Sequence, residues 1–576
     1  MNRPDNIRPK KWEVAPLAPP ALQHEFSHIN PILLQILYNR GLAKTAVMQP
    51  FLDGRYHQSR DPFLLPDMEK AAARVIQAIQ NDEKIVIYGD FDADGVTSTI
   101  VLVEGIRGLG AIRDNVRPYI PDRIKEGYGL NKEALTTIKE EFETDLVITV
   151  DCGIRSVDEV AHANAIGLDI IITDHHGLGD TLPDALAIVN PKRPSSQYPE
   201  IMLAGVGIAY KLVEAVQQTL PNPPDYDIET LLDLVAIGTV ADLAPLLGEN
   251  RDLVIRGLAV MNKLERPGLA ALAKIARVQE GQLTAESIGF GLGPRINAAG
   301  RIGHAYDAAK LLAAPDLRHA NALALKLDAL NKDRQQLTRD MSELAETMVD
   351  SDAPIIIAGD PSFHPGVVGL VASRLADSFY RPAIAMEIGE EVSHASCRSI
   401  PDFHITDALD EASDLLVRHG GHAQAAGLTI RNENIPAFKE KMTAIANDRL
   451  RGMELVPAIA IDCEIDLEDV DYALYETLRQ LEPTGNANAS PIFLSRDVEV
   501  VSHRAVGVDG GHLQMKLLSG RSQAHSREAI ASIAFRQGSW GEFLPARVDI
   551  VYSIGINEWR GQRNLQLQIQ DINLTE

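Results

Sequence analysis

The chain has 576 residues, 45% of them hydrophobic and 23% charged, which predicts a soluble globular protein of two to four domains. The formal net charge of -25 argues against a broad, nonspecific nucleic-acid surface, although a narrow basic channel stays compatible with it. There is no run of about 18 apolar residues, and Cys152, Cys397 and Cys463 form no CxxC pair. We therefore expect a cytoplasmic protein without a membrane span, a disulfide framework or a thiolate zinc site.

Residues 1–80 carry short apolar segments broken by Pro, and we expect a helical N-terminal extension there. From residue 84, apolar runs of strand length alternate with helix-length segments such as 96–109 and 155–167. This pattern predicts a parallel sheet that is covered on both faces, within a domain over 81–314. The runs are KIVIYGD, DLVITVD, DIIITDHH and ALAIVNP, and three of the four end in Asp or His.

The second half of the chain contains three further predicted parts. A polar stretch over 315–352 has apolar residues near helical spacing and no internal Pro or Gly after its start, which predicts one helix of about 35 residues, or roughly 50 Å. A second α/β unit is expected over 353–455. Short alternating strands over 456–576 predict a small antiparallel barrel.

The stretch GDFDADG at 89–95 allows three interpretations: a calcium loop, an acidic turn, or part of a catalytic metal site. An EF-hand loop needs an acidic residue at its twelfth position and a helix before it. Counted from Asp90, the twelfth residue is Val101, and a predicted strand precedes the loop, so the calcium loop is excluded. An acidic turn or a helix cap remains an alternative, because Asp and Gly favour both.

Other acidic and imidazole side chains follow the neighbouring predicted strands. Asp151 ends one of them, and Asp174, His175 and His176 follow another. The carboxyl ends of parallel strands converge at one edge of a sheet, where such groups repel each other unless a cation is present. Asp242, in an apolar helix-like run, either caps a turn or is a buried charge that needs a partner. Oxygen and imidazole ligands suit Mn²⁺ or Mg²⁺, and two such ions about 3.5–4 Å apart can support phosphoester hydrolysis.

These motifs resemble a known family. DFDADG, VDCG, TDHH and VADLAP resemble the four successive motifs of the DHH phosphoesterase family, and HPGVVG, SCRS and GGHAQAAG resemble its DHH-associated domain. The length, the segment GPRINAAGRIG and the barrel-like C-terminus are most similar to the single-strand-specific 5′-to-3′ DNA exonucleases of that family. The resemblance covers roughly residues 30–576. It implies a multidomain α/β fold: a DHH parallel-sheet domain and a smaller DHH-associated α/β domain joined by the long helix, with a C-terminal OB-like β-barrel.

The resemblance also implies a ligand set for two Mn²⁺ or Mg²⁺ ions. Asp151 would bridge the ions, His176 would lie beside the scissile phosphate or behind the ligands, and Asp90 would support the cluster. Several family members have a His where this chain has Tyr88, so one ion site could be weaker or completed by water or by Asp90. The implied ligands are Asp92, Asp94, Asp151, His175 and Asp242.

Substrate contacts are implied by the same resemblance. Arg123, Arg301, Ser396 and Arg398 would bind a 5′-phosphate, which is reasonable because guanidinium groups bind phosphate with two hydrogen bonds. Any one of these arginines could equally form a surface salt bridge. His422, flanked by glycines, could contact the DNA backbone or be structural.

In the C-terminal strands, Trp559 beside Arg560 and Arg563 is the best candidate for stacking on a base, although core packing or a protein contact is nearly as plausible for it. The segment GFGLGP lacks the GxGxxG spacing and a preceding strand, so it is not a dinucleotide-binding motif.

The leading hypothesis is an exonuclease that binds single-stranded DNA with a 5′ end and releases 5′-mononucleotides during recombination and repair. We expect a monomer, with a single-strand binding protein and a helicase as partners implied by the resemblance. One alternative is a DHH phosphodiesterase of short oligonucleotides or cyclic dinucleotides, and a shorter family II pyrophosphatase is less favoured. A hypothesis of another class is a noncatalytic DNA-binding scaffold.

Overall fold

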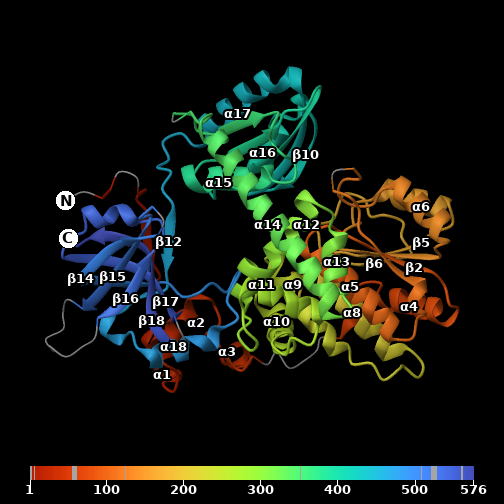
Figure 1. Ribbon diagram of the computed structural model, residues 1–576, viewed down its shortest axis with the longest axis horizontal. Coiled ribbons are helices and arrows are strands. Elements are labelled where there is room, and N and C mark those ends of the chain that lie inside the picture. Colours follow the sequence, from red (N-terminus) through yellow and green to blue (C-terminus); the bar gives the residue numbers. More distant parts are fainter. Residues whose placement is uncertain are drawn as a thin grey trace. The chain divides into compact units, whose positions relative to one another are not determined.

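The computed structural model describes residues 3–4, 7–54, 61–123, 125–350, 352–507, 509–519, 529–559 and 562–575. The chain divides into two compact units (Figure 1). One unit is Gln58–Met453, and the other joins Met1–His57 to Glu454–Glu576. Among the described residues, no helix is both long and apolar enough to cross a membrane.

The first half of Gln58–Met453 is built on a five-stranded sheet in the order β3-β2-β4-β5-β6, in which every pairing is parallel. Figure 1 labels β2, β5 and β6 of this sheet. Four strands of the sheet coincide with the predicted apolar runs, so the parallel sheet is confirmed. The fifth, β3, was not predicted: it has four residues with a Pro inside, and it lies at the sheet edge, where a missing N–H is tolerated. The strands are β2 (Ile85–Gly89), β3 (Val116–Tyr119), β4 (Leu146–Val150), β5 (Asp169–Thr173) and β6 (Ala187–Val189).

Helices cover both faces of this sheet, which explains why its strands are apolar throughout. Ile85 and Ile87 belong to one buried cluster with α4, α5, α8 and α9, whereas Val86 and Tyr88 belong to another with α6 and α7. Successive side chains of a strand therefore enter different cores. The helices are α4 (Met68–Gln80), α5 (Ala93–Gly108), α6 (Lys132–Phe142), α7 (Val157–Ala165), α8 (Gly205–Thr219) and α9 (Leu232–Ala241).

The register of the sheet aligns the ends of four strands. The last residues of these strands pair in one row, namely Gly89, Val150, Thr173 and Val189. The residues that follow them are polar in every case: Asp90, Asp151, Asp174 and Asn190. The sheet thus brings four polar residues to one edge from positions that are up to 100 residues apart.

A helical layer continues from α9 to the long helix α14 (Leu317–Glu346), which has 30 residues and so spans about 45 Å, somewhat less than expected. One end of α14 packs on α11, α12 and α13, and it also packs on α15 of the second sheet. An ion pair of 2.9 Å between Arg295 and Asp328 ties α12 to α14. The helices before α14 are α10 (Gly248–Met261), α11 (Pro267–Ala276), a π-helical turn (Ser287–Leu292), α12 (Gly293–Ile302) and α13 (Tyr306–Leu312).

The second sheet has the order β10-β11-β9-β8-β7, with β7 and β8 parallel and the other pairs antiparallel. Helix α15 packs on β8 and β9, whereas α16 packs on β10 and β11. The elements are β7 (Ile356–Asp360), α15 (Val368–Phe379), β8 (Ala383–Glu387), β9 (Val392–Arg398), α16 (Ile405–Glu411), β10 (Leu416–His422), β11 (Ala425–Arg431) and α17 (Ile435–Arg449).

In the other unit, five long strands form a circuit of pairings that runs β14-β15-β16-β18-β17 and returns to β14. The expectation of a purely antiparallel barrel is wrong, because β16 and β18 are parallel. A parallel pair arises here because β17 is inserted between them in sequence but pairs on the far side of β18. The strands are β14 (Phe493–Val506), β15 (His512–Ser519), β16 (Ile530–Ala534), β17 (Arg547–Trp559) and β18 (Gln562–Leu574).

The N-terminal residues form part of this same unit rather than a purely helical extension. Strand β1 (Lys11–Val14) pairs in parallel with β12 (Ala458–Ile461), and Trp12 Nε1 donates a hydrogen bond of 2.8 Å to the buried carboxylate of Asp571. Helix α4, by contrast, packs on α8 and β6 in the other unit. The remaining elements are α1 (Pro20–Glu25), α2 (Pro31–Asn39), α3 (Thr45–Leu52), β13 (Cys463–Glu464) and α18 (Tyr472–Leu478).

Candidate metal centre and substrate cleft

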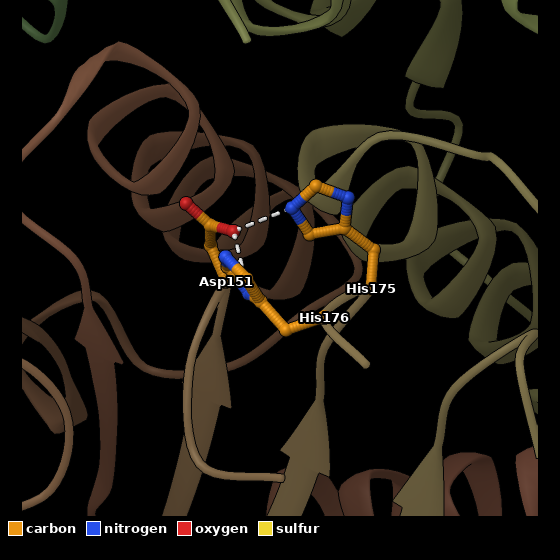
Figure 2. Close-up of side chains that lie close together, drawn as sticks. All are labelled: Asp151, His175 and His176. Carbon is orange, nitrogen blue, oxygen red and sulfur yellow. Dashed lines mark ion pairs between the residues drawn. The ribbon is translucent and has the colours of Figure 1, made fainter. Parts of the chain in front are cut away.

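The centre of the candidate site is the carboxylate of Asp151, which follows β4 and is 2% exposed. Both imidazoles that follow β5 face it (Figure 2). His175 Nε2 lies 3.0 Å from Asp151 Oδ1, and His176 Nδ1 lies 3.7 Å from the same oxygen. The strand register thus places three predicted site residues in direct proximity.

Two further predicted ligands, Asp94 and Asp242, also lie near the His175 ring. Asp94 Oδ2 is 3.9 Å from His175 Nε2, and Asp242 Oδ2 is 3.8 Å from His175 Nδ1. The carboxylate of Asp94 also accepts hydrogen bonds of 2.8 and 2.9 Å from the backbone N–H groups of Gly205 and Val206, at the N-terminus of α8. A helix N-terminus is a favourable place for such a negative charge.

The opening motif contributes its remaining aspartates on the β2 side. Asp92 is the N-cap of α5, because its Oδ1 accepts hydrogen bonds from the backbone N–H groups of Asp94 and Gly95. The helix-cap alternative is therefore correct for Asp92 Oδ1. The other carboxylate oxygen of Asp92 does not cap the helix and can serve as a metal ligand. Asp90 is buried, and its Oδ1 has no hydrogen-bond partner in the described part of the chain.

Three groups of side chains offer ligand atoms that lie within 4.8 Å of one another. Asp151 and His175 each belong to two of the groups, so the groups form one continuous cluster. Among the described residues, Asp90 Oδ1 is buried and has no hydrogen-bond partner. Asp151 Oδ1 and His175 Nε2 face each other at 3.0 Å, but they too are buried without a hydrogen bond, and a bound cation relieves this condition. The groups are Asp151–His175–His176, Asp94–His175–Asp242 and Asp90–Asp92–Asp151.

The acid–base properties of the cluster point to the same need for cations. Burial, together with the neighbouring aspartates, raises the pKa values of Asp90 and Asp151 well above the usual range. The same causes raise the pKa of Asp94 to about 7 and that of Asp242 to about 8. Burial lowers the pKa of His175 to about 3, so this imidazole is neutral and has a free lone pair. Carboxylates with a neutral imidazole are a suitable donor set for Mn²⁺ or Mg²⁺.

Asp174 holds His176 in place, a role that the sequence did not reveal. Its Oδ1 accepts hydrogen bonds from His176 Nδ1 and from the His176 backbone N–H, at 2.8 and 2.9 Å, and its Oδ2 accepts one from the Ile154 backbone. Burial by itself raises the pKa of Asp174, but these hydrogen bonds lower it overall. The only signal in the sequence was its position at the strand end.

Tyr88 stands where family members often have a ligand histidine, and its side chain does not face the carboxylates. It is fully buried in the core beneath α6, stacks on Tyr119 at 5.1 Å, and donates a hydrogen bond of 3.1 Å to the carbonyl of Gly129. The group Asp90–Asp92–Asp151 is complete without it. Asp90 therefore lies within reach of the position that the resemblance assigned to water or to Asp90.

The predicted phosphate-binding residues also come together. The guanidinium of Arg123 lies over the ring of Phe91 at 4.7 Å and interacts with Asp90 and Asp92. Burial and the charges of Arg123, Arg334 and Arg398 lower the pKa of Arg301 to about 10. We call these four residues the arginine cluster; Arg334, on α14, was not predicted.

Arg398 of the arginine cluster and the neighbouring Ser396 lie beside the start of α15. A Cβ atom on Gly369, in the first turn of α15, would lie 3.4 Å from Arg398 Nη2 and 3.5 Å from Ser396 Oγ. Arg301 Nη1 donates a hydrogen bond of 3.3 Å to the carbonyl of Gly366, just before that helix. Guanidinium groups, a hydroxyl and a helix N-terminus together suit a phosphate.

A cleft of about 780 Å³ adjoins the centre at His176, and we call it the substrate cleft. One wall contains Tyr128, Arg155, Asp174 and His176, and the other is formed by β9, β10 and β11. His422 lies on that second wall, so the structure brings this predicted residue opposite His176. The side chain of Trp559 and residue Arg560 lie outside the described part of the chain.

Comparisons with known proteins agree with this architecture. Residues 84–239 match the DHH family N-terminal domain, residues 352–448 match the DHHA1 domain, and residues 461–571 match the RecJ OB domain. The single-stranded-DNA-specific exonuclease RecJ of Bacillus subtilis is 40% identical over 95% of this chain and 69% of its own length. The RecJ of Salmonella typhimurium is 34% identical over 94% of this chain and 96% of its own length. The chain belongs to the RecJ family.

Solved RecJ structures have the same fold. The crystal structure of Thermus thermophilus RecJ in complex with Mn²⁺ has a TM-score of 0.83 and 32% identity, and the match covers 98% of this chain and 80% of that one. The structure of the same RecJ with Mg²⁺ gives a TM-score of 0.78 and 30% identity, covering 98% of this chain and 79% of that one. The predicted fold class, with its DHH, DHH-associated and OB parts, is therefore confirmed.

Proposed function

We propose that this protein is a single-stranded-DNA-specific exonuclease that hydrolyses phosphodiester bonds in the 5′-to-3′ direction and releases 5′-mononucleotides. The observation that carries the proposal is a cluster of carboxylates and imidazoles with orphaned ligand atoms, placed between the arginine cluster and the substrate cleft. Membership of the RecJ family supports the same substrate and reaction.

Two Mn²⁺ or Mg²⁺ ions are part of the proposal. When bound, such ions supply a water of lowered pKa and stabilise the charge on the leaving oxygen. Asp151 is the proposed bridging ligand, because it belongs to two of the ligand groups, and Asp174 keeps the His176 ring beside it. The ligands that we propose are Asp90, Asp92, Asp94, Asp151, His175 and Asp242.

The proposed direction follows from the positions of the two flanking sites. The arginine cluster interacts with Asp90 and Asp92, whereas the substrate cleft reaches the centre at Asp174 and His176. A terminal 5′-phosphate carries more charge than an internal phosphodiester, so the arginine cluster favours the 5′ end. The strand then crosses the metal centre and continues into the cleft.

The wider setting is also a proposal. A role in DNA recombination and repair, in the cytoplasm and as a monomer, agrees with the names of the relatives, which are single-stranded-DNA-specific exonucleases. A helicase and a single-strand binding protein are the partners that such an enzyme needs when its substrate must first be unwound. Co-purification of tagged protein with these partners, and its mass in solution, test this setting.

Two alternatives are less favoured. A phosphodiesterase of short oligonucleotides or cyclic dinucleotides does not need a cleft beyond the scissile bond or an OB unit, and this chain has both. A noncatalytic scaffold does not need intact ligands, yet all the predicted ligand side chains converge here.

The test is degradation of 5′-phosphorylated single-stranded DNA with Mn²⁺, comparing the wild type with Asp151→Ala. We expect mononucleotides from the wild type, a loss of at least 100-fold in the variant, and little attack on blunt duplex DNA. Equal activity of the two proteins would disprove the catalytic assignment. Turnover of dinucleotides or cyclic dinucleotides without turnover of longer strands would favour the first alternative.

A further inference from the structure

The second sheet presents a polar face to the substrate cleft. Side chains on β9, β10 and β11 alternate, so that every second residue points to the same side. Ala395, Cys397, Leu428 and Ile430 are buried on the opposite side. The polar face carries Arg398, Ser396 and His394 from β9, Ala425, Gly427 and Thr429 from β11, and His422, Gly420 and Arg418 from β10.

The strand register orders these residues into rows. Arg398, Ala425 and His422 form one row, and Ser396, Gly427 and Gly420 form the next row of this face. His394, Thr429 and Arg418 form the third row. The first and third rows are four residues apart, or about 13 Å along the strands. That length matches about four stacked nucleotides, and fewer in an extended strand.

Two of the three residues in the middle row, Gly427 and Gly420, have no side chain. A Cβ atom on Gly420 would have nothing within 4 Å, and one on Gly427 would have only the carbonyl oxygen of Ala395, at 3.8 Å. A DNA backbone can therefore approach the sheet closely between the two outer rows. Helix α15 approaches this face at Ser396 and Arg398, next to Gly369.

The charges of the cleft suit a polyanion. Arg418 at the far end of the polar face and Arg155 on the opposite wall are both exposed, and within the described part of the chain neither forms an ion pair with a carboxylate. Arg155 Nε donates a hydrogen bond of 2.8 Å to the carbonyl of Gly177, which fixes its stem beside His176. The cleft also contains two acidic side chains, but Asp174 is engaged by His176. Two unpaired arginines facing one cleft stand out in a chain of net charge -25.

We propose that Arg155 and Arg418 bind the backbone phosphates of the nucleotides on the 3′ side of the scissile bond, with His394 and Thr429 completing the far row. This inference rests on the proposed exonuclease function and adds a binding track that the metal centre and the arginine cluster do not supply. Its consequence is a dependence on substrate length: a dinucleotide ends before the far row, whereas a longer strand reaches it.

The experiment compares wild type with Arg155→Gln, Arg418→Gln and the double variant at about 0.15 M salt with Mn²⁺. Arg431→Gln is the matched control, because Arg431 is exposed on the same sheet and does not line the cleft. The substrates are a 5′-phosphorylated dinucleotide and a 5′-phosphorylated 20-mer of single-stranded DNA. We expect each cleft variant to raise KM for the 20-mer about 5- to 10-fold, as expected for one lost phosphate contact. For Arg418→Gln, turnover of the dinucleotide should stay within about twofold, because a dinucleotide ends before the far row.

Binding of a fluorescent 20-mer in EDTA separates this inference from the proposed function. The slope of log affinity against log salt should fall by about 0.7 for each arginine removed, and Arg431→Gln should leave it unchanged. If the wild type binds the 20-mer but does not degrade it, the exonuclease proposal is contradicted. The binding comparison still shows in that case whether Arg155 and Arg418 contact the DNA. The inference is overturned if the cleft variants bind like the wild type, if the wild type does not bind, or if dinucleotide turnover falls as much as 20-mer turnover.

Discussion

At the scale of single residues, the main feature is a group of buried aspartates at the candidate metal centre, where water cannot screen their charges. Asp151 is 2% exposed, its Oδ1 has no hydrogen-bond partner among the described residues, and burial together with neighbouring carboxylates raises its pKa. Such an arrangement destabilises the metal-free fold, because a desolvated charge needs a counter-charge. The cluster therefore lowers the stability of the metal-free fold and provides a site that a divalent ion can fill.

We predict that Asp151→Asn makes the metal-free protein more stable and removes its response to Mn²⁺. The neutral amide removes a repulsive charge, and a gain of about 1 kcal/mol corresponds to roughly 2–4 °C in Tm. In the wild type, Mn²⁺ at about 100 times its Kd should add about 2.7 kcal/mol. Thermal unfolding with EDTA and with Mn²⁺ measures both effects, and an equal Mn²⁺ response in the two proteins would contradict the ligand assignment.

A second prediction concerns Asp174, which positions His176 without facing the other carboxylates. Asp174→Asn should lower kcat on single-stranded DNA by about 10- to 100-fold and leave KM nearly unchanged, because the variant loses the orientation of a ring and not a substrate contact. Steady-state kinetics measure this split. Asp158→Asn, at an exposed position of α7, is the control and should match the wild type. A change confined to KM would show that Asp174 acts on binding instead.

At the scale of elements, the site depends on the close approach of the α8 N-terminus to the sheet edge. A Cβ atom on Gly205 would lie 2.8 Å from Asp94 Oδ2 and 3.1 Å from the Cβ of Asp151. Only glycine leaves both carboxylates in place, and the two backbone N–H groups that bind Asp94 come from this same turn. The N-terminus of α8 and the carboxyl end of β4 are thus in van der Waals contact.

We therefore predict that Gly205→Ala lowers kcat by at least about 10-fold, since a displacement near 1 Å at a catalytic centre can cost 100-fold. Gly289→Ala is the control, because a Cβ atom there would meet nothing within 4 Å. Exonuclease rates and Tm should be measured together. Full activity of Gly205→Ala would mean that the carboxylates have room to move.

In the other unit, the N-terminal strand stabilises the C-terminal strands. Trp12→Ala should destabilise this unit by about 2–4 kcal/mol, because it removes aromatic packing and leaves the buried carboxylate of Asp571 with one hydrogen bond fewer. Val14→Ala, at a residue that is 43% exposed, should cost much less. Urea unfolding of the whole chain tests this, and equal midpoints for the two variants would contradict it.

The elements show which features the sequence could predict. Long apolar strands such as β4 and the residues that end them were predictable, because period and polarity are local properties of the chain. The pairing of β1 with β12 was not, since it joins segments more than 400 residues apart. Arg155 and Arg418 were missed for a similar reason. The sequence does not show that an arginine lines the cleft, because this depends on the strand register and on the opposite wall.

At the scale of the whole molecule, the distribution of charge matters more than its sum. The chain has a net charge of -25, yet the described residues place the arginine cluster and two unpaired arginines around the carboxylates of the metal centre. DNA should therefore bind through a few defined phosphate contacts and be repelled elsewhere. In the proposed binding mode, the arginine cluster holds the 5′ end and the remainder of the strand extends through the substrate cleft.

The most direct test of this account follows the order in which the two ends of one strand are released. Single-stranded DNA labelled at its 5′-phosphate or at its 3′ end is digested by the wild-type protein with Mn²⁺, and products are resolved over time. We expect the 5′ label to appear at once as a mononucleotide, while the 3′ label stays in a shortening ladder. Release of the 3′ label first, or internal fragments from both substrates, would contradict it.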